Sequence, residues 1–132
     1  MRIEGWESLL NAYIEQAKTL AFEWGHFDCA LWSADWVRIA TGNDFASQWR
    51  GLYATEAELA GLLADRGFDS PQDIPTSVGL PAMHPAFAKR GDIVLNEQGC
   101  LGICNGVVSY FLMERGVTMF RTLSCTYAWK VG

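Results

Sequence analysis

The strongest constraint on this chain is a change in the spacing of its apolar residues after the middle of the sequence. Up to about residue 67 the apolar positions recur at steps of three and four residues, which is the period of amphipathic helices. From about residue 90 they form short runs rich in β-branched and aromatic residues, separated by glycine-containing turns. Helices followed by consecutive strands predict an α+β fold.

The chain length predicts a single domain over residues 1–132. Half of the residues are apolar and six are tryptophan, so a packed core is expected and disorder is excluded. Within this domain we expect a helical half at about 1–67, a loop at about 68–89 and a β half at about 90–132.

Three helices are predicted in the first half. The first covers residues 3–24 and is stopped by Gly25, and the second covers residues 29–40 and is apolar on most sides. The third starts at a capping box formed by Thr55 and Glu58 and closes at Arg66-Gly67. The following loop holds all four prolines and shows little periodicity, so we expect it to be irregular.

The β half is predicted to form an antiparallel meander of about five strands, on which the N-terminal helices pack. The expected strands are residues 92–95, 100–104, 107–113, 117–123 and 127–131. Tight turns are expected at residues 97–99, at Asn105-Gly106 and at Arg115-Gly116, and Asn-Gly is the strongest hairpin signal among them.

The charge distribution bears on partners and location. The formal net charge is −5 and the ten Lys and Arg residues are scattered, which argues against nucleic-acid binding. Acidic residues stand where a signal peptide would carry its apolar stretch, and no apolar run has the length of a membrane span. We therefore expect synthesis in a cytoplasm and no membrane insertion.

Four cysteines are too few and too unevenly spaced for the disulfide framework of a small secreted domain. We expect reduced thiols. Cys100 and Cys104 fall on one face of a predicted strand and, with Cys125 and a histidine, suggest a zinc site, but structural zinc usually takes two closely spaced pairs. The prediction is therefore no metal and no cofactor.

Cys29 is the residue with the clearest chemical potential, because it is placed where the second helix begins. Unpaired N–H groups and the macrodipole at a helix start favour a thiolate. The ordinary alternative is a cysteine that only fills the core. Asp28, just before it, is explained by helix capping without any chemistry.

Three segments around these positions resemble the NlpC-type, papain-like cell-wall peptidases of bacteria and phage tails. Phe22-Glu23-Trp24-Gly25-His26-Phe27-Asp28-Cys29 resembles the motif that leads into the nucleophile helix of that family. Arg90-Gly91-Asp92-Ile93-Val94-Leu95 resembles its first sheet strand, and Cys100-Leu101-Gly102-Ile103 falls where the family reads His-Val-Gly-Ile. The resemblance implies a papain-like NlpC-type fold with Cys29 at the nucleophile position.

The same resemblance shows what is missing for catalysis. The position of the family's catalytic histidine is occupied by Cys100, and a thiol is a poor substitute for imidazole as a proton shuttle. Phe22 and Ala30 replace a tyrosine and a serine of the family pattern. His26, three residues before Cys29, is the candidate replacement base; its ordinary alternative is an exposed loop side chain.

Small proteins with this pattern resemble a family encoded among the tail genes of phages, prophages and gene-transfer agents. That resemblance implies a virion component at the tail tip, beside the hub and distal tail proteins, with a degenerate peptidase site. The alternative is an active cysteine endopeptidase that cleaves peptidoglycan stem peptides during genome delivery, with Cys29 as nucleophile.

Four further side chains carry structural expectations. His84 is expected at the surface, and Trp49 is expected to be an exposed contact residue. The other tryptophans are expected mostly in the core. Asp35 and Arg38 are expected to pair on the helix surface, because they are three residues apart.

Overall fold

A six-stranded antiparallel sheet, with its strands in the order β1-β6-β2-β3-β4-β5, organises the protein. The computed structural model describes all 132 residues. The strands are β1 (Ala82–Met83), β2 (Ile93–Leu95), β3 (Leu101–Cys104), β4 (Val108–Met113), β5 (Gly116–Arg121) and β6 (Tyr127–Trp129). The helices are α1 (Trp6–Ala17), α2 (Cys29–Thr41), α3 (Glu56–Asp65) and α4 (Asp73–Ser77), with short 3-10 turns η1 (Pro85–Phe87) and η2 (Thr122–Ser124). The expected α+β class is confirmed.

Strands β2 to β5 form the predicted meander, but the last strand does not extend it. Turn η2 carries the chain back, and β6 inserts between β1 and β2. Thr126 donates a backbone hydrogen bond to Leu95 O at 2.8 Å, which starts this pairing. The sheet thus has one strand more than expected, because β1 pairs with β6 at its outer edge.

The first helix is shorter than predicted: α1 ends at Ala17, and residues 18–24 are not helical. The apolar residues Leu20, Phe22 and Trp24 are spaced two apart, as in an extended chain. Leu20 and Phe22 pack on the main core, whereas Trp24 packs on a second cluster near α3. The prediction failed because the helical and the extended period coincide at some of these positions.

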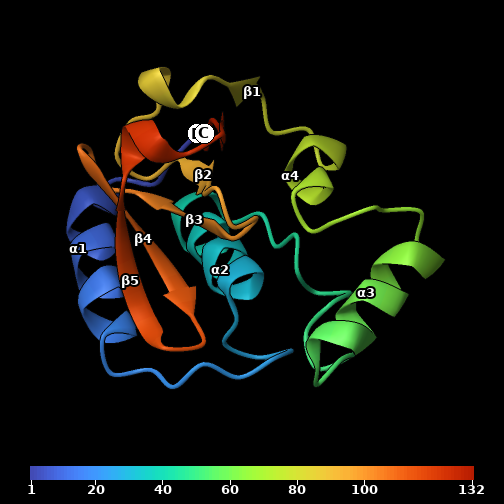
Figure 1. The fold of residues 1–132 in the computed structure, drawn as a ribbon. Coiled ribbons are helices and arrows are strands. Elements are labelled where there is room, and N and C mark those ends of the chain that lie inside the picture. Colours follow the sequence, from blue (N-terminus) through green and yellow to red (C-terminus); the bar gives the residue numbers. More distant parts are fainter.

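Helices α1 and α2 cover the same face of the sheet (Figure 1). Their side chains share one core with the inward-facing residues of β2, β3, β4 and β6, and this core contains Leu10, Ile14, Trp32, Trp36, Ile93, Ile103, Leu112 and Trp129. The opposite face carries a smaller cluster of Val94, Cys104, Phe111, Cys125 and Ala128. Successive side chains of β2 and β3 point to opposite faces of the sheet, and an apolar cluster covers each face. This explains why both strands are buried throughout.

The predicted loop at 68–89 contains the short helix α4, the strand β1 and the turn η1. The indole N–H of Trp129 donates to the hydroxyl of Thr76 at 2.9 Å, and Lys130 N donates to Pro81 O at 2.9 Å. These contacts come from the last strand, nearly 50 residues later in the chain, so the local proline pattern could not predict them.

Helix α3 and the segment before it surround a second apolar cluster. Thr55 caps α3 by accepting from Glu58 N at 3.1 Å, as the capping box predicted. Trp49, expected to be exposed, is 9 % exposed and lies in this cluster with the guanidinium of Arg66 over its ring.

Asp35 pairs with Arg50 instead of Arg38, and Arg50 also binds Asp44. No helix is long and apolar enough to cross a membrane.

The two chain termini lie side by side (Figure 1). The guanidinium of Arg2 donates to Val131 O at 2.8 Å, to Arg90 O at 2.6 Å and to the carboxylate of Asp92 at 2.8 Å. The Asp92 carboxylate also accepts from Val131 N at 3.0 Å. One arginine therefore fastens both termini to the start of β2.

Candidate functional site

Cys29 is the first residue of α2, as predicted. Asp28 caps this helix by accepting from Leu31 N at 2.9 Å, and its second carboxylate oxygen accepts from Gly25 N at 3.0 Å. Asp28 is almost completely buried. The carboxylate therefore fixes both the helix start and the loop before it, which confirms the capping interpretation of Asp28.

Tyr53 is a member of the site that the sequence did not suggest. Its hydroxyl donates to the Asp28 carboxylate at 2.5 Å, in a buried position. Burial and the neighbouring Asp28 carboxylate raise the pKa of Tyr53 far above its usual value. Tyr53 lies 25 residues from Asp28 in an irregular segment, so no local pattern signals the contact.

Gly25 permits this arrangement. Its φ is +84°, and a β-carbon at this position would lie 1.9 Å from the carbonyl oxygen of Tyr53. Gly51 N also donates to Gly25 O at 2.8 Å. Only glycine allows the two backbone segments to approach so closely, which gives a physical reason for the Trp24-Gly25 sequence before the helix.

Cys100 lies next to Cys29. It was predicted as the first residue of a strand at 100–104, but β3 begins one residue later, at Leu101. The N–H of Cys100 donates to the side-chain oxygen of Asn96 at 3.0 Å. The thiols of Cys29 and Cys100 are close enough to shift each other's pKa, and both side chains are partly exposed. The structure thus brings together two residues that are 71 positions apart in the sequence.

The two thiols differ in acidity. The hydrogen bond from Cys29 lowers the pKa of Cys100 to about 7, against the opposing effects of burial and of the Glu56 and Glu114 carboxylates. The pKa of Cys29 is raised well above its ordinary value, first by this hydrogen bond, then by burial and by the charges of Cys100 and Asp28. Only the backbone N–H of Leu101 acts in the other direction. Cys100 is therefore the more acidic thiol of the two.

His26 is an exposed loop residue beside Gly51. The groups that shift the pKa of Cys29 are Cys100, Asp28 and Leu101, and His26 is not among them. His84 is exposed as expected, and its Nδ1 accepts from Ala86 N at 3.0 Å at the start of η1. Neither imidazole is joined to Cys29 by a hydrogen bond.

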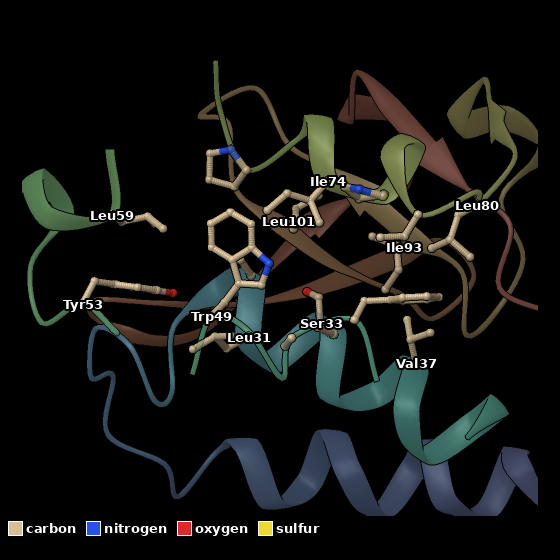
Figure 2. Close-up of a pocket in the computed structure, with 17 residues that line it drawn as sticks. Leu31, Ser33, Val37, Trp49, Tyr53, Leu59, Ile74, Leu80, Ile93 and Leu101 are labelled. Atoms are coloured by element: carbon tan, nitrogen blue, oxygen red, sulfur yellow. The ribbon is translucent and has the colours of Figure 1, made fainter. Parts of the chain in front are cut away.

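An apolar pocket of about 60 Å³ lies between α2 and the segment around α4, and neither Cys29 nor Cys100 lines it. Ala30 and Leu101, the neighbours of the two cysteines in the sequence, belong to its lining, as does Tyr53. Figure 2 shows Leu31, Ser33 and Val37 pointing from α2 towards Ile74 and Leu80 on the opposite side. Fourteen of the 17 lining residues are hydrophobic, so the pocket suits an apolar group and offers few polar partners to a substrate.

The other two cysteines lie elsewhere. Cys104 and Cys125 are buried in the cluster on the far face of the sheet, and burial raises the pKa of Cys125 to about 11. Cys104 accepts from Gly106 N at 3.4 Å. No three side chains of the His, Cys, Asp or Glu type gather closely enough to hold a metal ion.

Comparison with known proteins gives one match. The model of a family described as a domain of unknown function (DUF6950) matches residues 1–131. No curated protein and no solved structure matches the chain. Since the match spans nearly the whole sequence, the chain belongs to the DUF6950 family.

Proposed function

We propose that this protein is a structural or assembly component of a phage tail tip, built on an NlpC-like domain that has no peptidase activity. The observation that carries the second part is the Cys29–Cys100 pair. A cysteine peptidase needs a nucleophilic thiolate and a base that returns the proton to the leaving amine. Here the pKa of Cys29 is raised, which disfavours its thiolate, and the residue opposite it is a second thiol.

Several features support an NlpC-like ancestry. The cysteine begins a helix that packs on an antiparallel sheet, and the Gly-Asp segment at Gly91-Asp92 leads into β2. Cys100, at the position where the resembling family keeps histidine, is near enough to Cys29 for the two thiols to shift each other's pKa. These positions agree with the resemblance in the sequence, and the proposed tail-tip role rests on that resemblance.

A second candidate function is an active peptidoglycan endopeptidase. It is favoured by the apolar pocket whose lining includes Ala30, the residue after Cys29, and by the placement of Cys29 at a helix start. In this alternative Cys29 would attack a stem-peptide bond. The missing base is the reason we place it second.

The two functions are separated by complementation in a phage or prophage that encodes this chain. An in-frame deletion is complemented with the wild-type gene or with Cys29→Ala. The proposal predicts that deletion gives particles with defective tails, that purified wild-type particles contain the protein, and that Cys29→Ala restores infection as well as the wild type does.

Two results would contradict the proposal. Normal tails and full infectivity in the deletion strain would exclude a structural or assembly role. Normal particles that fail to infect when complemented with Cys29→Ala would instead favour the peptidase.

A further inference from the structure

The apolar pocket between α2 and the segment around α4 adjoins a second, larger space. This space is a groove of about 610 Å³, and it shares the lining residues Phe45, Trp49, Ile74 and Val78 with the pocket. Figure 2 shows Trp49 on one side of the pocket and Leu80 on the other. The pocket and the groove therefore meet at these four residues, and one ligand can occupy both.

The pocket accepts an apolar group of limited size. Its lining contains two hydroxyls, and each already donates a hydrogen bond within the protein. Ser33 donates to Cys29 O at 2.8 Å, and Tyr53 donates to the buried Asp28 carboxylate. An apolar cavity of about 150 Å³ holds a benzene ring. A pocket of about 60 Å³ therefore suits a smaller group, such as the branched end of a leucine or valine side chain.

The groove differs from the pocket because it carries a free positive charge. Half of its ten lining residues are polar or charged. The one acidic residue among them, Asp44, is paired with Arg50 at 2.9 Å. The one basic residue, Arg66, is exposed and forms no ion pair. The guanidinium of Arg66 is therefore available to an anion.

Arg66 is oriented next to the pocket. Its Nη1 donates to Gln48 O at 2.6 Å, and its guanidinium carbon lies 4.5 Å from the ring centre of Trp49. Its Nε and Nη2 have no hydrogen-bond partner in the protein. This pair of N–H donors has the fork geometry that binds both oxygens of a carboxylate. Since Trp49 lines both spaces, the charge lies within reach of a short ligand whose apolar end fills the pocket.

We propose that the pocket and the groove together bind small carboxylates that carry a branched aliphatic chain. The aliphatic end occupies the pocket, and the carboxylate binds Arg66. Such a ligand is either a free short-chain acid or the C-terminal residue of a peptide that ends in leucine or valine. The site contains neither Cys29 nor Cys100, and the inference does not depend on the proposed function.

The test titrates the ¹⁵N-labelled full chain with sodium 4-methylpentanoate and follows its backbone amide resonances by NMR. The neutral 4-methylpentanamide is the charge control, and 4-phenylbutanoate is the size control. The acid should shift resonances of lining residues such as Ala46, Arg66 and Val78 in a saturable manner. The amide should bind roughly fivefold more weakly, because it lacks the charge that Arg66 recognises. The bulkier acid should also bind more weakly than 4-methylpentanoate.

Three variants separate the two parts of the site. Arg66→Gln should lower the affinity for the acid to that for the amide, whereas Arg115→Gln, at another exposed arginine without an ion pair, should bind as the wild type does. Ala34→Leu fills the pocket and should abolish binding of both ligands, with circular dichroism to show that it is folded. If Ala34→Leu does not fold, the surface change Arg66→Gln still decides the outcome.

The source of the ligand is distinguished by a second titration with acetyl-Gly-Gly-Leu and its C-terminal amide. A peptide acid that binds roughly tenfold more tightly than 4-methylpentanoate assigns the site to peptide C-termini, and a weaker one assigns it to free acids. The proposal is overturned by the absence of saturable shifts at the lining residues. Equal affinities of the wild type for 4-methylpentanoate and its amide, or an unchanged affinity in Arg66→Gln, would overturn it as well.

Discussion

At the scale of single residues, the chemistry of this site depends on which of two sulfurs holds a shared proton. The start of a helix favours a thiolate at Cys29, but the Cys100 thiol, partial burial and the Asp28 carboxylate all raise its pKa. The interaction with Cys29 lowers the pKa of Cys100. The interaction with Cys100, burial and the Asp28 charge outweigh the helix dipole, so Cys100 is the more acidic thiol.

This assignment predicts a pH profile. A lowered pKa means that the Cys100 thiolate is present at lower pH than an ordinary thiolate, so alkylation of Cys100 by iodoacetamide should be half-maximal near pH 7. Cys29→Ala removes the donor and should move the midpoint up towards the ordinary value of 9.0. Site-resolved mass spectrometry measures both profiles; a midpoint unchanged by the substitution would contradict the assignment.

The buried contact between Tyr53 and Asp28 predicts an energetic coupling. Tyr53→Phe removes a hydrogen bond to a charged group and should lower the free energy of unfolding by about 1.5–3 kcal/mol. Asp28→Ala removes the helix cap as well. In a double-mutant cycle by urea unfolding, the two changes should couple by about 1 kcal/mol or more; strict additivity would show that the contact contributes nothing.

At the scale of elements, the position at which α2 begins depends on a close approach between the backbone segments around Gly25 and Tyr53. Gly25 and Tyr53 meet where no side chain fits, and Gly102 in β3 lies under the ring of Phe111 in the same way. Gly25 thus joins two irregular segments that are far apart in the sequence, whereas Gly102 and Phe111 lie on the adjacent strands β3 and β4. The position of the candidate site therefore depends on packing between elements as much as on the helix itself.

Glycine substitutions test this placement. Gly25→Ala should destabilise the fold by more than about 2 kcal/mol, because it combines an unfavourable φ with overlap against the Tyr53 carbonyl. Gly61→Ala is the matched control in α3, where a β-carbon meets nothing within 4 Å, and it should stabilise by about 0.5–1 kcal/mol. Equal effects of the two changes in thermal unfolding would refute the close contact.

The elements also show where sequence reasoning succeeds. Helices α2 and α3 and strands β2 to β5 were predictable because caps, turn glycines and apolar period agree at their ends. The end of α1, the strand β1 and the place of β6 were not, since they depend on contacts made by distant residues such as Trp129 with Thr76. At the site, Cys29 and Cys100 were found from the sequence, whereas Tyr53 has no local signal.

At the scale of the whole molecule, both chain termini are bound to the sheet through Arg2. Arg2 joins residues from both ends of the chain to the start of β2, and its partner Asp92 is buried. The same region positions α2, because the indole N–H of Trp36 donates to Gly91 O at 2.9 Å. Loss of Arg2 would therefore affect the core that carries Cys29.

Arg2→Ala should lower the free energy of unfolding by about 3 kcal/mol, since it leaves the Asp92 carboxylate buried without its cation. Lys18→Ala, which breaks the exposed pair with Glu15, serves as the control and should leave stability unchanged. Urea unfolding of the two variants distinguishes a structural ion pair from a surface one. Similar small effects would mean that the termini are held by other contacts.

The most direct test of the central claim is digestion of purified peptidoglycan by the reduced full-length protein, followed by chromatography of released fragments. Cys29→Ala is the control. If the Cys29–Cys100 site is not a peptidase, the wild type releases no more fragments than Cys29→Ala does. Fragment release that depends on Cys29 would contradict the account and establish the protein as an enzyme.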